Sequence, residues 1–357
     1  MSHEERIAAI TAFRYTERQA RCLDVVMRHA GVCLQRQYSA FAGTVHGQRT
    51  RAFFAKLLRR NHASCHGCRH NRGHVYQVHH LPLYKGIGQP NSRHRRPIAA
   101  GRVVERLMMI DAILAGTDVT WLAAGNEIRS HVAGLPSLAG GPLTIDLEQR
   151  ASMAVDLSTE TLRIGGDPNG RTVLLRLVTL AGPEDFRTFL GRAAPLLVSL
   201  PTWTLRLAFP RALSATHESY QRVVREEWET PLHPRTLDEL RWYFEQRRSR
   251  GPGQSPFPID IRFEQAANVF QGPRFDRLYR RWLRGGADAL SEAASPAISV
   301  ALASGSGRVE SLVLDHSYEH LSPVLGTRRG AGSCVENPIE IRSISELQAA
   351  ESIVQPG

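Results

Sequence analysis

The sequence contains almost no lysine, although it is strongly basic. Only Lys56 and Lys85 occur among its 45 basic residues, so arginine supplies nearly all of the positive charge. Both lysines lie in the first 100 residues, so any catalytic pattern that needs a lysine in the remaining chain has no candidate there.

Cysteine and long apolar segments are also scarce. Five cysteines in 357 residues form an odd, sparse set, which fits reduced thiols better than a disulfide framework. No apolar run approaches the roughly 18 residues that cross a bilayer, and the first ten residues lack the basic-then-apolar order of a signal peptide. We therefore expect a cytoplasmic protein with no membrane partner.

Common catalytic motifs are missing as well. The sequence has no G-x-x-x-x-G-K-[ST] loop, no G-x-S-x-G elbow and no H-E-x-x-H helix. These absences make a non-enzymatic function the favoured interpretation, with no cofactor.

The positive charge is concentrated in one part of the chain. Residues 1–100 contain 17 basic and four acidic residues, a balance of +13, whereas the remaining chain has 28 basic and 30 acidic residues. The same 100 residues contain ten of the fifteen histidines. Such segregation of charge is typical of a module that binds phosphate groups, joined to a second domain with a different function. The alternative is a solvated basic surface that maintains solubility.

Three helices are predicted in this basic segment. The first begins at a capping box of Thr16 and Gln19, and Gly31 follows its last turn. A short second helix ends at Gly43, and a third covers residues 46–61. A short helix, a glycine-containing turn and a third helix form the helix-turn-helix order.

The third helix has an apolar and a basic face. At about 100° per residue, its four large apolar residues fall on one arc, which must pack against the other two helices. The opposite arc contains Gln48, Arg49, Ala52, Ala55, Lys56 and Arg59. Alanines between long polar residues allow a helix to lie close to the floor of a DNA groove. The alternative is an ordinary amphipathic helix with a solvated basic face.

A β-hairpin is predicted after the third helix, in the stretch SCHGCRHNRGHVYQVHH at residues 64–80. Its basic tip corresponds to the wing of a winged helix, which would contact the DNA backbone or minor groove. We expect Gln48, Arg49, Lys56 and Arg59 to engage the major groove of double-stranded DNA. The predicted phosphate contacts are Arg36, Arg51, Arg69 and Arg72.

The order of TERQARCLDVVMRHAGVCLQRQYSAFAG, HGQRTRAFFAKLLRRN and the predicted wing resembles the winged-helix module of replication-relaxation proteins from bacterial plasmids and integrative elements. The resemblance covers about the first 100 residues well and the rest loosely. It implies a DNA-binding accessory or regulatory protein of a mobile element, acting in transcription regulation, replication or transfer.

The predicted hairpin also offers a zinc alternative. Cys65 and Cys68 have the Cys-x2-Cys spacing that supplies two ligands of a tetrahedral site, and His70 and His74 are the nearest additional donors. Only one residue separates Cys68 from His70, which leaves little chain to close an ordinary finger. A wing without metal is therefore the favoured interpretation.

An α/β domain is predicted after a linker and helix at 93–142. Within 143–296, two strands around a DPNG turn, a helix and a further strand resemble a restriction-endonuclease-like core. Arg176 stands where a Mg²⁺-binding carboxylate would be needed, which indicates a degenerate, inactive core. The segment 297–357 is predicted to be loosely ordered.

The sequence thus predicts an α/β (α+β) protein with an N-terminal winged helix-turn-helix at 1–92. Its second domain is expected to serve dimerisation or protein docking. The alternatives are a Mg²⁺-dependent nuclease acting on element DNA and a protein-assembly factor.

Overall fold

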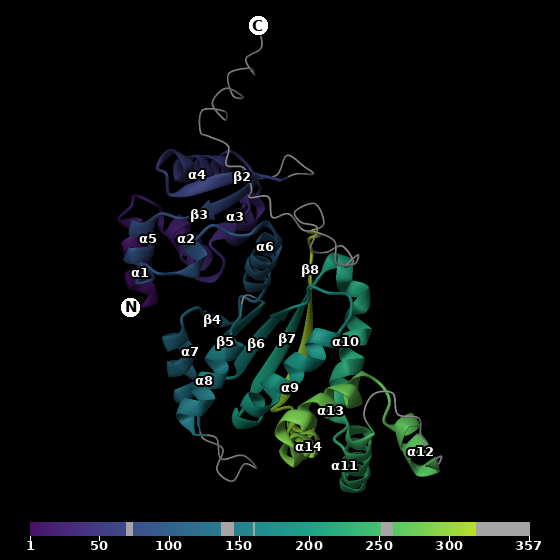
Figure 1. Cartoon of the computed structure of the whole chain (residues 1–357). Coiled ribbons are helices and arrows are strands. Elements are labelled where there is room, and N and C mark those ends of the chain that lie inside the picture. Colours follow the sequence, from purple (N-terminus) through teal and green to yellow (C-terminus); the bar gives the residue numbers. More distant parts are fainter. Residues whose placement is uncertain (69–73, 137–145, 160, 251–259, 319–357) are drawn as a thin grey trace.

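The computed structural model describes residues 1–68, 74–136, 146–159, 161–250 and 260–318. It is a mixed α/β structure with two sheets, as the sequence predicts. Figure 1 shows the N-terminal elements at one end of the molecule, the larger sheet in the middle and a group of helices at the other end.

The N-terminal part combines helices with a small antiparallel sheet. Its elements are α1 (His3–Thr11), α2 (Glu17–His29), β1 (Val32–Cys33), α3 (Gln35–Ala42), α4 (Gln48–Arg59), β2 (Ala63–Gly67), β3 (His74–Val78) and α5 (Leu81–Gly86). The strand order is β1-β3-β2, and both pairings are antiparallel. α1 and α5 have no counterpart in the sequence-based prediction.

Local sequence signals set the ends of the first helices. The Thr16 hydroxyl accepts from the Gln19 backbone N–H at 3.3 Å, and the Gln19 side chain accepts from the Thr16 N–H at 3.1 Å. Gly31 and Gly43 follow α2 and α3 with φ of 74° and 61°, a left-handed conformation that glycine adopts without strain. The predicted capping box and both helix ends are therefore confirmed.

The second sheet has five strands in the order β4-β5-β6-β7-β8. They are β4 (Thr120–Leu122), β5 (Leu162–Gly166), β6 (Thr172–Leu177), β7 (Trp203–Pro210) and β8 (Gly307–Leu314). The first three strands pair antiparallel, whereas β6, β7 and β8 pair parallel. The crossover from β6 to β7 contains α9 (Glu184–Ser199), because parallel neighbours need a long connection.

Helices cover both faces of this sheet. α6 (Ala100–Ala115) packs on one face, where Val173, Leu175 and Leu177 join a core that also includes Phe53 and Phe54 of α4. Leu174 points to the other face, whose core includes residues of α7 (Gly125–Ala133), α8 (Leu147–Leu157) and α9. Burial on both faces explains why the strands are nearly continuous apolar runs.

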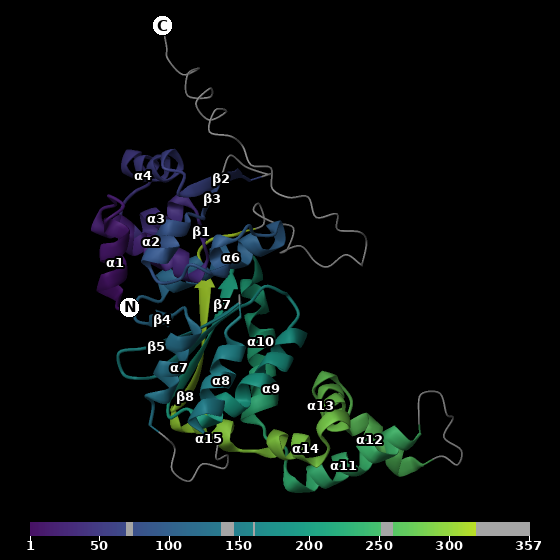
Figure 2. The same cartoon turned by 60° about the vertical axis from the view of Figure 1, so that its left-hand side comes forward.

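A third core belongs to a helical segment at the end of the molecule opposite α4 (Figure 2). It is formed by α11 (Pro234–Ser249), α12 (Ile261–Val269), α13 (Pro273–Gly285) and α14 (Ala287–Ala294). The chain reaches it through η2 (Arg211–Thr216), α10 (His217–Val224) and η3 (Arg225–Glu229). Large aromatic residues of α11 and α13, among them Phe244 and Trp282, form its centre.

Two predicted segment boundaries need correction. The segment 93–142 contains η1 (Arg93–Arg95), strand β4 and helix α7 besides α6, so it is part of the packed structure rather than a linker. The segment 297–357, predicted to be loosely ordered, contains α15 (Ala297–Ser304) and β8. β8 was missed because its partner β7 lies about 100 residues earlier, and local sequence does not encode such a pairing.

Within the described ranges, none of the helices is long and apolar enough to span a membrane.

Candidate nucleic-acid interface

α4 presents one buried and one exposed face. Thr50, Phe53, Phe54 and Leu57 are buried. The residues exposed to solvent are Gln48, Arg49, Arg51, Ala52, Ala55 and Arg59. Figures 1 and 2 both show α4 at the end of the molecule farthest from the helices α11 to α14, with none of the described helices or strands over its outer side. We call these six exposed residues the α4 face.

Packing against α3 and β3 fixes the position of α4. The hydroxyls of Ser39 and Thr50 lie 3.1 Å apart, which ties α3 to the first turn of α4. The rings of Tyr38 and Phe53 are 4.4 Å apart between centroids, and those of Phe54 and Tyr76 are 4.3 Å apart. Each of these buried rings contributes about 1.5–3 kcal/mol by leaving water. The exposed side chains therefore project from a rigid support.

The positive charge of the α4 face is not neutralised within the described part of the chain. Arg49, Arg51 and Arg59 make no salt bridge there, and α4 itself contains no Asp or Glu. Its N-cap, Gly47, provides no side chain to accept from the first backbone N–H groups. Unpaired N–H groups and the helix dipole make this end of a helix attractive to an anion.

Lys56 is only partly available to an external partner. Its ammonium donates to the Arg14 carbonyl at 2.5 Å and lies 5.0 Å from the centroid of the Tyr15 ring. Burial, together with the neighbouring Arg60 and Arg59, lowers the pKa of Lys56. The predicted groove contact therefore also attaches α4 to the turn between α1 and α2.

Arg36, a predicted phosphate contact, is half-buried and paired within the protein. Its guanidinium donates to both carboxylate oxygens of Asp111 on α6, each at 2.8 Å. The hydroxyl of Tyr318, just after β8, donates to the same carboxylate. This geometry gives Arg36 a structural role that joins α3 to α6, and it does not place Arg36 on the α4 face.

Arg69, Arg72 and His70 lie outside the described residues. The described candidates for the zinc alternative are Cys65, which is buried in β2 opposite Tyr76, Cys68, which directly follows β2, and His74 at the start of β3. Burial raises the pKa of the Cys65 thiol to about 11, which disfavours the thiolate that binds metal. Among the described residues, no group of three or more His, Cys, Asp or Glu side chains could hold a metal ion.

Two features near α4 were missed by sequence reasoning. Val45, in the turn before α4, is 92% exposed, which is unusual for a large apolar side chain. His62, just after α4, accepts or donates a 2.6 Å hydrogen bond with the Tyr15 hydroxyl and stacks on His80 at 4.2 Å between ring centroids. In the sequence, the exposed Val45 is marked only by an apolar residue in a polar turn. The contacts of His62 could not be predicted because they depend on packing between distant segments.

No family model matches this chain, and searches of curated proteins and of solved structures also found no match.

Proposed function

We propose that the protein binds duplex DNA and that α4 is its recognition helix. The observation that carries this proposal is the α4 face: three arginines without an ion-pair partner among the described residues, and a glutamine, surround two alanines on a rigidly packed helix at one end of the molecule. A surface that only served solubility would be expected to carry charges of both signs, whereas α4 contains no Asp or Glu.

The order of elements supports a winged helix-turn-helix module. α2, β1, α3, α4, β2 and β3 follow one another, and the three strands form one antiparallel sheet. In such modules the helix at the place of α4 enters the major groove, and the hairpin at the place of β2 and β3 contacts the backbone or minor groove. The tip of this hairpin, with Arg69 and Arg72, lies outside the described residues.

The chemistry of recognition follows from the side chains. Gln48 and Arg49 stand at the N-terminal end of α4, which approaches base edges in helix-turn-helix complexes. Arginine donates two hydrogen bonds to guanine, whereas the glutamine amide donates one hydrogen bond to adenine N7 and accepts one from the adenine N6 amino group. Arg51 and Arg59 would hold phosphates, and the exposed Val45 would contact a thymine methyl group.

For the larger sheet we propose a restriction-endonuclease-like core that has lost its active site. The antiparallel pair β5 and β6, the helix α9 and the parallel strand β7 support this likeness. No Asp or Glu occurs on β5, β6 or β7. Glu310 on the neighbouring strand β8 and Asp118, just before β4, both accept hydrogen bonds from Arg206 at 3.2 Å.

This core and the helices α11 to α14 would then act in dimerisation or in docking another protein. Together with the resemblance of the first 100 residues to replication-relaxation proteins, these features favour a regulatory or accessory factor of a bacterial mobile element.

The test measures binding of the full chain to labelled random duplex and single-stranded DNA at two salt concentrations. The full chain is required because α6 and the sheet complete the core that contains Phe53 and Phe54. We expect duplex binding whose affinity falls steeply with salt. Absence of duplex binding at low salt would refute the proposal, and Mg²⁺-dependent cleavage of plasmid would favour the nuclease alternative instead.

A further inference from the structure

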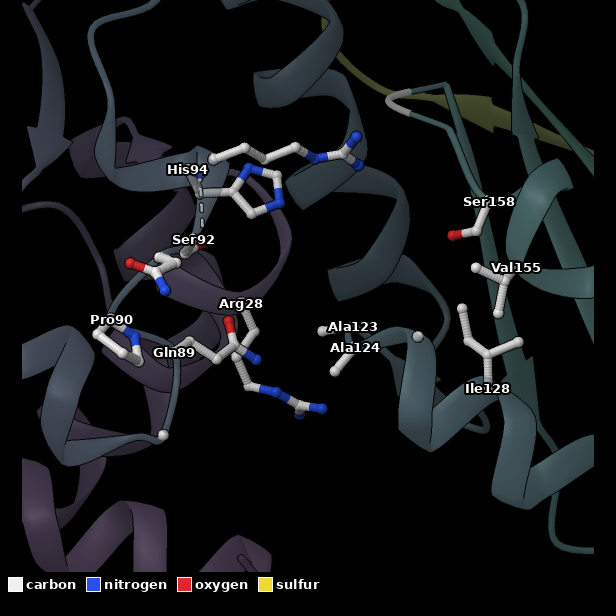
Figure 3. A pocket seen from close by; sticks show the side chains of 14 residues that line it. Arg28, Gln89, Pro90, Ser92, His94, Ala123, Ala124, Ile128, Val155 and Ser158 are labelled. Carbon is white, nitrogen blue, oxygen red and sulfur yellow. Dashed lines mark hydrogen bonds between the residues drawn. The ribbon is translucent and has the colours of Figure 1, made fainter. Parts of the chain in front are cut away.

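The larger sheet domain has a cavity on one side and an open edge on the other. The cavity, of about 550 Å³, lies between the loop at 88–94 and the helices α7 and α8 (Figure 3). His94, which lines it, is buried. The guanidinium of Arg28 and the backbone N–H of Ala124, at the start of α7, both donate to the carboxylate of Glu127. The anion-binding groups beside the cavity are therefore already paired, whereas the edge is not.

β8 forms this open edge. The strand order ends at β8, and among the described strands only β7 pairs with it. The pairing runs from Gly307 to Leu314 without a bulge, and β8 contains no proline and no lysine. β4, at the opposite edge, has only three residues. Proteins block sheet edges by short strands, bulges, prolines and lysines, and β8 has none of these features.

The pairing with β7 shows which backbone groups of β8 face outward. The Trp203 N–H donates to the Ser306 carbonyl at 2.9 Å, so Ser306 and every second residue after it turn their backbone groups toward β7. The intervening residues turn theirs away from the sheet, and they are Gly307, Val309, Ser311 and Val313. A row of outward N–H and C=O groups pairs with a strand of another chain.

Side chains along this edge form an exposed surface that is partly apolar. Val313 is 47% exposed and Ser311 is also exposed. Both lie on the same face of β8 as Val309, which packs against the core shared by α7, α8 and α9. α15 lies beside the beginning of β8 (Figure 2), and its Val300 is 60% exposed. A strand added at this edge would cover part of this surface.

The charged side chains of β8 lie on its other face and leave the edge accessible. Arg308 and Glu310 alternate with the valines along the strand. The Glu310 carboxylate accepts from Arg206 of β7 at 3.2 Å, so it is held within its own sheet. The Arg308 side chain is exposed and long enough to keep its guanidinium in water beside an added strand.

We propose that two copies of this chain pair antiparallel through the outer edges of β8. This interface makes the proposed dimerisation specific, and it does not depend on DNA binding by α4. A two-fold axis requires β8 to be complementary to itself. Pairing centred on Ser311 meets this requirement, because it places Val309 of each copy opposite Val313 of the other. β-Branched residues in opposite positions stabilise a pair of strands.

Other registers fit less well. Pairing centred on Glu310 places two carboxylates opposite each other, which is unfavourable. Pairing centred on Val309 leaves Val313 outside the paired segment. The register centred on Ser311 also brings the end of β8 that carries Val313 to the beginning of β8 in the second copy, where α15 and its exposed Val300 lie. These matches favour a second copy over an unrelated strand.

Analytical ultracentrifugation of the full chain, from low to high micromolar concentrations, tests the proposal. We expect a reversible dimer with twice the monomer mass of 39.7 kDa. Val313→Asp would bury an unpaired carboxylate against Val309 of the second copy, so the dissociation constant should rise at least about tenfold. Val269→Asp, at a 64% exposed position on α12, is the matched control and should leave dimerisation unchanged.

A cysteine at the two-fold axis tests the register. Opposite Cα atoms of a hydrogen-bonded antiparallel pair lie about 5.5 Å apart, which a disulfide can bridge. Mild oxidation of Ser311→Cys should therefore give a covalent dimer that reduction separates. The controls are the unchanged chain, with its native cysteines, and Ser249→Cys at an exposed position on α11. Both should form several-fold less covalent dimer.

Three results would overturn the proposal. A chain that stays monomeric at every concentration refutes the β8 pairing and dimerisation of the sheet domain together. A dimer that is equally stable in Val313→Asp and Val269→Asp refutes pairing through β8 but leaves dimerisation through another surface. Ser311→Cys that crosslinks no more than its controls excludes the pairing centred on Ser311. DNA binding is measured separately and is unaffected by any of these outcomes.

Discussion

Arg28 of α2 donates to both carboxylate oxygens of Glu127 in α7, at 2.7 and 2.5 Å, and so joins the N-terminal part of the chain to the sheet domain. The guanidinium of Arg163 on β5 extends the same junction by donating to the His29 carbonyl at 2.8 Å. Cationic donors at the C-terminal end of α2 also interact favourably with its helix dipole. The two parts of the fold are therefore connected by charge as well as by a shared apolar core.

Replacing Glu127 by Gln should destabilise the protein. The change removes the charge of the partly exposed Glu127 beside Arg28, whose side chain is 9% exposed and keeps Asp24 as an ion-pair partner at 3.9 Å; we expect a cost of about 2–3 kcal/mol. Urea denaturation measures the free energy of unfolding. Glu239→Gln, at an exposed position on α11, is the matched control and should change it by less than about 0.5 kcal/mol. Equal stability of the two variants would show that the ion pair does not support the junction.

Removing arginines from the α4 face should weaken DNA binding. Arg49→Ala removes a proposed base contact worth about 1–3 kcal/mol. Arg59→Ala removes a proposed phosphate contact, so the plot of the logarithm of the binding constant against the logarithm of salt concentration should become shallower by about one unit. Fluorescence anisotropy with labelled duplex at several salt concentrations separates the two effects. Arg248→Ala on α11, also exposed, provides the control. If all three variants bind duplex equally well, α4 is not the recognition helix.

Arg36→Met should lower stability rather than selectively remove a phosphate contact. The substitution deletes two hydrogen bonds to Asp111 and leaves that carboxylate short of partners, at a cost of about 1–3 kcal/mol. Asp111→Asn should have a similar effect on urea denaturation, because it disrupts the same pair from the other side. An Arg36→Met protein of normal stability with a reduced salt slope in DNA binding would restore the sequence-based assignment of Arg36 to the DNA backbone.

Stability should fall on acidification below about pH 6.5. Burial and nearby positive groups lower the pKa of His62 from 6.5 to about 4, and they also lower the pKa values of His29 and His94 well below 6.5. At a pH between the folded and the unfolded pKa of such a histidine, the unfolded chain binds a proton that the folded protein does not. Protonation therefore favours unfolding. The loss from His62 should therefore develop from pH 6.5 to about 4 and level off below that.

Urea denaturation across this pH range measures the effect. His62→Gln, which can retain a hydrogen bond to Tyr15, should flatten the pH dependence, whereas the exposed His46→Gln should not. An unchanged pH profile in His62→Gln would contradict this assignment.

The parts of the fold that depend on local sequence could be predicted, and those that depend on distant contacts could not. Thr16, Gly31 and Gly43 mark helix ends through their own conformational preferences, and the apolar period of α4 identifies its buried face. β8 was missed because its long-range pairing, rather than its sequence, makes it a strand. α1 and α5 are short, and their stability comes from tertiary packing.

In the candidate site, too, features set by local sequence could be predicted and features set by distant contacts could not. The exposed positions of Gln48, Arg49 and Arg59 follow from helical geometry, so sequence reasoning placed them correctly on the outer face of α4. Arg36 could not be assigned in this way, since its partner Asp111 lies 75 residues later in the chain. The cavity near His94 was also beyond prediction, because its two walls come from segments that only the folded structure brings together.

The hydrogen bond between Tyr318 and Asp111 joins residues separated by 207 positions and has a consequence for the order of synthesis. A nascent chain has already exposed α2, α3 and α4 to solvent or to chaperones long before Tyr318 leaves the ribosome. Until then, α6 lacks β8 and the Tyr318 ring, both of which cover its core. The amino-terminal helices can form early, whereas their final anchoring must wait until the chain has been made as far as Tyr318.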